Sequence, residues 1–273
     1  MSLINRIEAA FEGTLDEAEA LKTFEEFMQA LNDGSVRAAE KKDDRWTVNG
    51  WVKKGILLGF RLGEISDYSF ESFSFYDKST FPLKTLSMKH GLRIVPGGSS
   101  IRNGCYIGKQ VTCMPPMYIN VGAYVDDQTM VDSHALIGSC AQIGKRVHIS
   151  AGSQIGGVLE PIGSLPVIIE DDVLIGGNCG IYEGTVVRKG AVIGAGTVIT
   201  GSTPVYDLVL GKIYKKTEES PLQIPPRAVV IPGTRPVLSS AGREWGLSVL
   251  TPIIIKYKDD KTKAQIELES FLR

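Results

Sequence analysis

The chain has 273 residues, of which 43% are hydrophobic and 22% are charged, and its formal net charge is -1. These values are typical of a globular protein of one or two domains and exclude an extensively disordered or fibrous chain. The near-zero charge gives no reason to expect a nucleic-acid partner, and no apolar run approaches the roughly 20 residues that cross a bilayer, so we expect no membrane contact either.

The N-terminus and the cysteines favour one cellular compartment. Residues 1–8 lack the basic and apolar segments of a signal peptide. The four cysteines include no CxxC pair and are too few for a disulfide scaffold. We therefore expect reduced thiols in a cytoplasmic protein.

Residues 1–95 are predicted to form a mainly helical N-terminal domain. Apolar residues from Leu21 to Leu31 recur at helical spacing and stop at Asn32-Asp33-Gly34, a typical helix end. A second helix is predicted from Trp51 to Arg61. Trp46 and Trp51 are interpreted as core residues rather than as a platform for a ligand, because large aromatic side chains most often serve core packing.

An internal repeat of six residues follows. A mostly aliphatic residue recurs at every sixth position, is interrupted once by eight residues (161–168), and then resumes in the same period. The repeat positions are Ile101, Ile107, Cys113, Ile119, Val125, Val131, Ile137, Ile143, Ile149 and Ile155, then Ile169, Ile175, Ile181, Val187, Ile193, Ile199 and Val205.

The period of six predicts a parallel β-helix. Neither an amphipathic helix nor a simple strand keeps this period, which is the signature of hexapeptide β-helices. Four positions after each aliphatic residue the side chain is mostly small, as at Ala123, Ala135 and Ala141. Both positions reach the axis of a narrow prism, so a large side chain at one requires a small one at the other. We assign residues 96–233 to this β-helix; the spacing alone does not fix its handedness.

The remainder of the chain is predicted as a small C-terminal extension. Residues 206–224 form a hairpin-like excursion from the β-helix, and Pro225 to Gly233 add a last edge to it. Residues 234–273 then contribute a strand over Leu250–Lys256 and a short amphipathic helix over Ala264–Arg273.

Function is expected on outward-facing side chains and loops, because the repeat residues themselves are scaffold. Asp132 follows the inward Val131 and should point away from the prism, where it is either a solvated acid or a catalytic one. Gly156 and Gly157 open the insertion; they allow close approach by a ligand or simply form a corner.

A zinc site would require three converging ligands, and the chain holds three histidines. His90 precedes the repeat, and His134 and His148 are 14 residues apart rather than one coil of 18. We therefore expect no metal.

Several segments, inside and outside the repeat, resemble the tetrahydrodipicolinate N-succinyltransferase family. The resemblance covers most of the chain and is carried by Leu31–Lys41, Trp51–Arg61, Gly91–Pro96, Val121–Asp132, Ile137–Gly144 and Gly156–Pro161. It implies a left-handed β-helix and a homotrimer with sites between subunits. It also implies transfer of succinyl from succinyl-CoA, a co-substrate, to the amine of ring-opened tetrahydrodipicolinate (2-amino-6-oxopimelate) in diaminopimelate and lysine biosynthesis, with no tightly bound cofactor.

The resemblance also implies roles for single residues. Arg93 matches the arginine that binds a substrate carboxylate, and its planar fork suits two-point hydrogen bonding. Asp132 matches the acid at the reacting amine, where a carboxylate can orient the amine and accept its proton.

Two positions depart from the family pattern. A second family glutamate falls on Gly180, which leaves Glu183 as a weaker candidate for a catalytic acid, and His134 stands where tryptophan is common. His134 is either a spare base or a surface residue. The phosphates of coenzyme A need cations, for which Lys215, Lys216 and Arg227 are candidates.

Two other functions remain open from the residues alone. One is an acetyl-CoA-dependent acyltransferase with the same fold acting on this or another amine, and the other is a non-catalytic β-helix scaffold.

Overall fold

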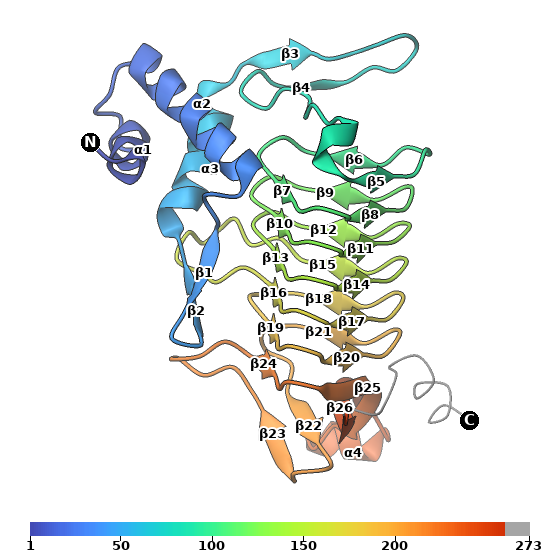
Figure 1. The fold of residues 1–273 in the computed structure, drawn as a ribbon. Coiled ribbons are helices and arrows are strands. Elements are labelled where there is room, and N and C mark those ends of the chain that lie inside the picture. Colours follow the sequence, from blue (N-terminus) through green and yellow to red (C-terminus); the bar gives the residue numbers. More distant parts are fainter. Residues whose placement is uncertain (260–273) are drawn as a thin grey trace.

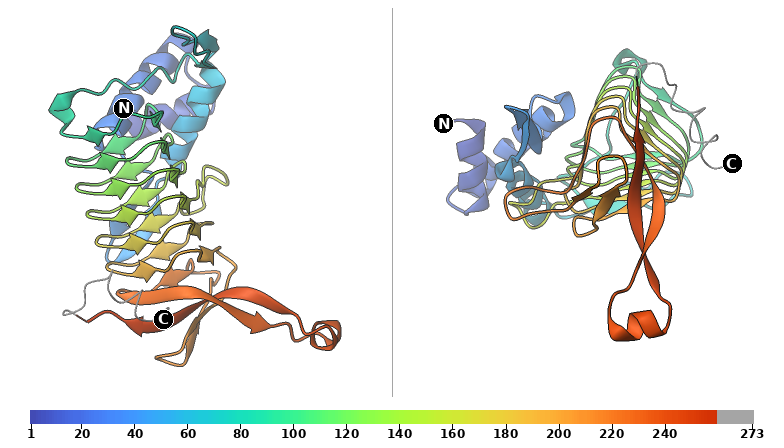
Figure 2. Two further views of the ribbon diagram at one scale, coloured as in Figure 1. Left: turned by 90° about the vertical axis from the view of Figure 1, so that its right-hand side faces the viewer. Right: turned by 90° about the horizontal axis from the view of Figure 1, so that it is seen from below.

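The computed structural model describes residues 1–259 and is dominated by a parallel β-helix of two-residue strands (Figure 1). The helix is left-handed, and its strands stack into three sheets that form the faces of a triangular prism (Figure 2). From Ile101 to Ile199 each residue of the predicted repeat is the second residue of its strand. The predicted fold class is therefore confirmed.

The three faces are named here after one strand of each. The β10 face contains β7 (Tyr106–Ile107), β10 (Tyr124–Val125), β13 (Gln142–Ile143), β16 (Ile168–Ile169), β19 (Val186–Val187) and β24 (Gln223–Ile224). The β11 face contains β5 (Arg93–Ile94), β8 (Thr112–Cys113), β11 (Met130–Val131), β14 (His148–Ile149), β17 (Leu174–Ile175) and β20 (Val192–Ile193). The β12 face contains β6 (Ser100–Ile101), β9 (Tyr118–Ile119), β12 (Leu136–Ile137), β15 (Gln154–Ile155), β18 (Gly180–Ile181) and β21 (Val198–Ile199).

The register advances by one coil of 18 residues, as in the pairing of Tyr106 with Tyr124. Across the insertion the step is 26 residues, from Gln142 to Ile168, which is one coil plus the eight extra residues. Ile168, counted in the insertion by sequence, already lies in strand β16. The extra residues therefore leave the prism as a loop without breaking its stacking.

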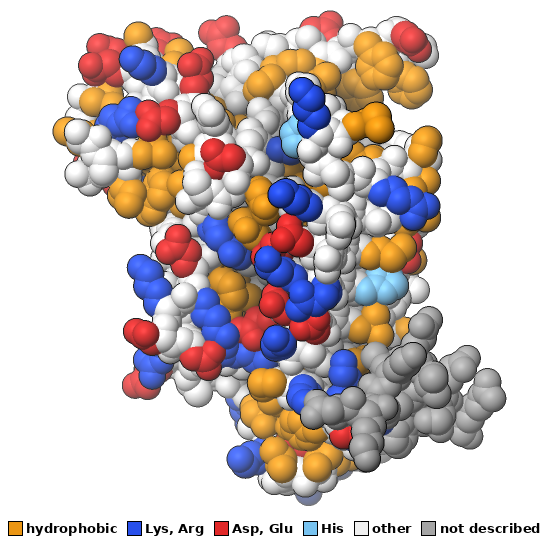
Figure 3. Space-filling model, in the orientation of Figure 1, with side chains coloured by type: hydrophobic (Ala, Val, Ile, Leu, Met, Phe, Trp, Pro, Cys, Tyr) orange, Lys and Arg blue, Asp and Glu red, His pale blue; other side chains and the backbone are white. Residues whose placement is uncertain are grey.

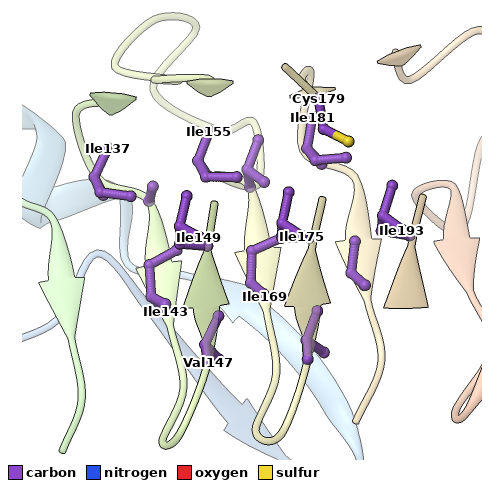
Figure 4. Packing of buried hydrophobic residues seen from close by; sticks show 14 of the residues in the cluster. Ile137, Ile143, Val147, Ile149, Ile155, Ile169, Ile175, Cys179, Ile181 and Ile193 are labelled. Carbon is purple, nitrogen blue, oxygen red and sulfur yellow. The ribbon is translucent and has the colours of Figure 1, made fainter. Parts of the chain in front are cut away.

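The interior of the prism is a column of aliphatic side chains. Ile137, Ile143 and Ile149 are fully buried, and Figure 4 shows their side chains, with those of the neighbouring coils, directed into the same core. Small residues such as Ala135, Ala141 and Ser153 are buried at the alternate positions. The large-and-small pairing that the hexads predicted is thus what fills the prism.

The N-terminal part packs against the side of the β-helix (Figure 1). Helix α2 begins after the N-cap Asp16 and ends at Gly34, whose φ of 78° is left-handed, so the predicted helix stop is confirmed. Trp51 packs edge-on against Phe27 at 5.9 Å, as expected of a core residue. The elements are α1 (Leu3–Phe11), α2 (Glu17–Asp33), β1 (Ala39–Lys42), β2 (Arg45–Val48), α3 (Gly50–Leu62), β3 (Ile65–Asp67), β4 (Tyr76–Lys78) and η1 (Met88–His90).

Hairpin β1–β2 is fastened to the β10 face by a charged network around Glu170. The carboxylate of Glu170 accepts hydrogen bonds from the indole of Trp46 at 2.9 Å and from the guanidinium of Arg188 at 3.0 Å. Lys41 forms an ion pair with it at 3.0 Å. Figure 3 shows acidic and basic side chains crowded over the coils in this region.

The C-terminal part extends the β11 face and then leaves the prism. The antiparallel ribbon of β25 and β26 projects from the end of the β-helix and carries α4 at its tip (Figure 2). The predicted strand over Leu250–Lys256 lies within β26, whereas the helix predicted over Ala264–Arg273 lies outside the described residues. The elements are β22 (Val205–Asp207), β23 (Lys212–Tyr214), β25 (Ala228–Pro236), α4 (Ser240–Glu244) and β26 (Ser248–Tyr257).

None of the helices within residues 1–259 is both long enough and apolar enough to span a membrane.

Candidate active site

Asp132 lies at the corner where the chain turns from the β11 face to the β12 face. It follows strand β11, so its side chain points off the prism and is partly exposed. Its Oδ1 accepts a hydrogen bond of 2.7 Å from the amide of Ser133, which fixes the orientation of the carboxylate. The second oxygen, Oδ2, remains directed toward a neighbouring coil.

On that neighbouring coil, Oδ2 of Asp132 faces His148. Strands β11 and β14 are paired, with Met130 beside His148, and Nε2 of His148 lies 3.7 Å from Oδ2 of Asp132. Nε2 is shielded from solvent and has no hydrogen-bond partner within residues 1–259. Sequence reasoning missed this pair because it compared the histidines with one another; the signal was the 18-residue register, which places residue 148 beside residue 130.

The other two histidines lie elsewhere. His90 is in η1, and its Nδ1 contacts Ser87, while His134 is exposed at a corner with a positive φ of 60°. Among residues 1–259, no three His, Cys, Asp or Glu side chains are arranged to hold a metal ion.

Arg93 opens the β11 face, on which the Asp132 corner also lies. Strand β5 pairs with β8, which pairs with β11, so Arg93 and Met130 are two strand steps apart, or about 10 Å along the face. The Arg93 side chain is exposed. A substrate bound along this face could therefore meet both the guanidinium and the carboxylate.

A large cavity lies at a different corner, between the β12 and β10 faces. Its volume is about 800 Å³, and its walls include Gly156, Gly157, Tyr182 and Glu183, with the insertion loop over one side. A second cavity of about 300 Å³ is lined by Lys215, Lys216 and Arg235, with Gly201, Ser202 and Pro204. Lys216 lines both cavities, so the larger one has a basic neighbour.

The glycines of the larger cavity are required by packing. A Cβ on Gly156 would lie 2.7 Å from the ring of Tyr182, and one on Gly157 would lie 2.6 Å from the amide nitrogen of Ser139. A Cβ on Gly180 would lie 2.5 Å from the same tyrosine ring. Tyr182 thus occupies the space into which a side chain at position 180 would project, and its hydroxyl donates a 2.8 Å hydrogen bond to Oε1 of Gln154.

Two predicted residues are less well placed than the others. Glu183 is exposed at the rim of the larger cavity and does not approach Asp132. Arg227 lines neither the larger nor the basic cavity; its Nε donates a 2.7 Å hydrogen bond to the carbonyl of Lys258.

The predicted site residues therefore form two groups in one chain. Arg93 and Asp132 belong to the β11 face, whereas Gly156, Gly157 and Glu183 lie across the β12 face from them. A single chain does not bring the two groups together.

The four cysteines are unsuited to nucleophilic catalysis. All are buried and free, and burial raises the pKa of Cys113 and of Cys140 to about 12 and that of Cys105 to about 11. Burial also raises the pKa of Cys179. Because the thiolate is the reactive form, an acyl group would not be carried on these side chains near neutral pH.

The fold is a left-handed β-helix with a helical N-terminal part, and it carries Asp132 at one corner and a cavity of about 800 Å³ with a basic neighbour at another. These features define the class of hexapeptide-repeat transferases. Residues 166–201 match the hexapeptide repeat of succinyl-transferases, and residues 2–62 match the N-terminal region of tetrahydrodipicolinate N-succinyltransferase. The chain belongs to the tetrahydrodipicolinate N-succinyltransferase family.

Full-length relatives carry the same assignment. Proteins named 2,3,4,5-tetrahydropyridine-2,6-dicarboxylate N-succinyltransferase are 39% identical in Acinetobacter baylyi, over 98% of this chain and 97% of that protein, and 38% identical in Rhodopseudomonas palustris, over 100% and 98%. The protein of that name from Polynucleobacter asymbioticus is 42% identical over 90% of this chain and 87% of its own length.

Proposed function

We propose that the chain transfers succinyl from succinyl-CoA to the amine of ring-opened tetrahydrodipicolinate, 2-amino-6-oxopimelate, in diaminopimelate and lysine biosynthesis. The observation that carries this proposal is identity of 38–39% to N-succinyltransferases over almost the whole of both chains. The reaction is placed in the cytoplasm, where four free thiols remain reduced.

The acceptor binds along the β11 face. Arg93 holds a carboxylate of the dicarboxylate substrate through paired hydrogen bonds, for which an exposed guanidinium is well suited. Asp132 then orients the amine, since its Oδ1 is held by the Ser133 amide and its partly exposed carboxylate pairs with no lysine or arginine among the described ion pairs.

The chemical step needs a neutral amine and a way to remove one proton. The amine nitrogen attacks the thioester carbon, the C–S bond breaks and coenzyme A leaves as its thiolate, which takes up a proton. The nitrogen loses its extra proton to Asp132, acting as general base. Backbone N–H groups at a glycine corner stabilise the negative charge that develops on the thioester oxygen.

The donor binds in the two cavities that Lys216 lines. The larger one, of about 800 Å³, accommodates the pantetheine arm, and Lys215, Lys216 and Arg235 of the smaller one face the phosphates. The buried Nε of Arg235 has no hydrogen-bond partner among the described residues, which supports an anionic ligand there. Arg227 is not used in this assignment.

The enzyme works as a homotrimer in which neighbouring subunits complete each site. The separation of Asp132 from the cavity across the β12 face supports this assembly. Large apolar side chains that are exposed in the single chain also support this assembly. They lie between β3 and β4 (Phe70, Phe73 and Phe75) and on the β25–β26 ribbon (Trp245 and Leu250).

Release of coenzyme A thiol tests this function. Purified protein is mixed with 2-aminopimelate and either succinyl-CoA or acetyl-CoA in the presence of a thiol reporter. We expect release with succinyl-CoA that depends on the acceptor. Release with acetyl-CoA alone would replace the proposal by an acetyltransferase, and no release with either donor would favour a scaffold.

A further inference from the structure

His148 presents an unused polar atom to the residue that has been assigned as the base. Its Nε2 lies 3.7 Å from Oδ2 of Asp132, is shielded from solvent and lacks a hydrogen-bond partner in the part of the chain that the structure describes. A buried polar atom without a partner is unfavourable, and in native proteins such atoms are rare. The β-helix nevertheless holds this one directly in front of a carboxylate.

The placement of His148 follows from the fold. It is the outward residue of strand β14, and on the β11 face it lies between Met130 and Leu174. These two neighbours are apolar, so the charged side chain that the ring faces among the described residues is Asp132. Part of the ring is exposed, with 41% of the side-chain surface accessible. The imidazole therefore connects the carboxylate to solvent.

The proposed reaction creates a need for such a connection. Carboxylates are weak bases near neutral pH, whereas imidazole accepts and releases protons there. Asp132 alone would therefore accept the amine proton unfavourably. Passing the proton on to an imidazole, which binds it more tightly, favours the transfer and restores the carboxylate.

We propose that His148 is a positioning and proton-accepting partner of Asp132, which holds the carboxylate toward the acceptor amine and carries the proton onward to water. The amine proton moves to Oδ2 of Asp132 and from there to Nε2 of a neutral His148, giving an imidazolium. The imidazolium releases its Nδ1 proton to water. One proton leaves the amine, one reaches solvent, and Asp132 returns to its ionised form. This inference rests on the proposed function, because it assigns a partner to the same base.

The test compares His148→Gln with His134→Gln, a matched change at an exposed histidine two residues from Asp132. Wild-type protein must first release thiol with succinyl-CoA; if it does not, the proposed function fails and His148 is not at issue. With an active wild type, we expect His148→Gln to lower kcat about 10- to 100-fold with little change in either KM. We expect His134→Gln to retain kcat.

Two further readouts separate proton transfer from a structural role. The pH profile of kcat should differ in shape between the wild type and His148→Gln, because the variant lacks the group that accepts the proton from Asp132. Free imidazole should restore part of the activity of His148→Ala and none of that of Asp132→Asn. Normal kcat in His148→Gln, an equal loss in His134→Gln, or no rescue of a folded His148→Ala would each overturn the proposal.

Discussion

Asp132 owes its candidate role to a position that the fold makes special. It is the first residue after an inward Val131, at a corner, with one oxygen held by a backbone amide. Asp126, at the equivalent position after Val125, is held in the same way by the Asp127 amide at 2.8 Å, but its carboxylate also lies 3.8 Å from the ammonium of Lys145. The carboxylate of Asp132 faces no lysine or arginine among the described ion pairs, which leaves it available to an amine.

Replacing Asp132 by Asn should therefore remove the base and keep the shape. We expect kcat for succinyl transfer to fall about 10²- to 10⁴-fold, because general base catalysis contributes on that order. The measurement is steady-state thiol release, accompanied by a thermal unfolding curve that should match the wild type. Near-normal turnover would remove Asp132 from the mechanism.

Gly180 marks the clearest difference from the family pattern, and Tyr182 gives a physical reason for it. A methyl group at position 180 would lie 2.5 Å from the tyrosine ring, so Gly180→Ala must displace the ring. We expect a loss of about 1–3 kcal/mol in the free energy of unfolding. Gly163→Ala is the matched control, because its Cβ would meet nothing within 4 Å. Equal stability of the two variants in urea unfolding would show that the ring moves freely.

Helix α3 controls the loop over the larger cavity through one buried lysine. Lys53 is fully buried, and its Nζ donates hydrogen bonds to the carbonyl oxygens of Ser164 at 2.6 Å and Pro161 at 3.4 Å. Burial lowers the pKa of Lys53. A helix of the N-terminal part thus holds the insertion loop, which lines the cavity, in place.

Lys53→Met should release this loop. We expect the KM for succinyl-CoA to rise by more than the KM for the acceptor. The free energy of unfolding should fall by about 1–3 kcal/mol, because two carbonyls of the insertion loop lose their donor. Lys54→Met is the control, since Lys54 forms an ion pair with Glu8 away from the loop. A rise in acceptor KM alone, or the same effects in both variants, would contradict the assignment.

Hairpin β1–β2 depends on the ionised form of Glu170. Burial by itself raises the pKa of this carboxyl, but hydrogen bonds from Trp46, Lys41 and the Lys189 amide, with the charge of Arg188, outweigh it and lower the pKa. A carboxyl with a lowered folded-state pKa stabilises the fold above its unfolded pKa. That contribution is lost as pH falls below the ordinary glutamate range through the folded value.

The expected outcome is acid-sensitive docking of the hairpin. As pH falls from about 5 to below about 3, the wild type should lose more unfolding free energy than Glu170→Gln, and protease cleavage near Asp43 should increase over the same range. The exposed Glu25→Gln serves as control and should follow the wild type. An identical pH dependence in Glu170→Gln and wild type would show that Glu170 is not the group that titrates.

The assembled molecule should be a trimer whose sites draw on two chains. Sedimentation should give three times the chain mass. Asp132→Asn subunits mixed with Lys216→Glu subunits, after unfolding and refolding together, should regain activity, up to about one quarter of wild type if the chains mix at random. Each variant refolded alone should remain impaired. No recovery in verified mixed trimers would place the whole site within one chain.

The architecture could be predicted because it repeats. Each six-residue unit has the same packing requirement, so the same pattern of residues recurs from Ile101 to Ile199. The single insertion can be recognised because it interrupts this pattern. Asp132 could be singled out because it directly follows an inward repeat residue, so that its side chain must point outward, and because it matches a family motif. The helix stop at Gly34 has an equally local cause.

The remaining features depend on contacts between coils or between distant segments. The Asp132–His148 pair, the fit of Tyr182 over Gly156 and Gly180, and the Lys53 anchor each join residues whose nearness is set by register or by docking. Lys215 and Lys216 were found by charge and do line a cavity, but the same criterion selected Arg227, which binds a backbone carbonyl. Charge alone does not distinguish a cation that faces a ligand from one that binds a backbone carbonyl of its own chain.

Because the coils stack uniformly, the length of the β-helix grows by the same amount with every coil. Neighbouring strands in a sheet are about 4.8 Å apart, so each coil of 18 residues adds one fixed increment between the end that carries Arg93 and the end that carries the basic cavity. Deleting or duplicating one complete coil would change this span by one increment and would keep the repeating pattern of inward residues. The distance between the two ends can then change only in steps of one coil. A related chain could therefore accept longer or shorter substrates by gaining or losing coils, without substitutions in the core.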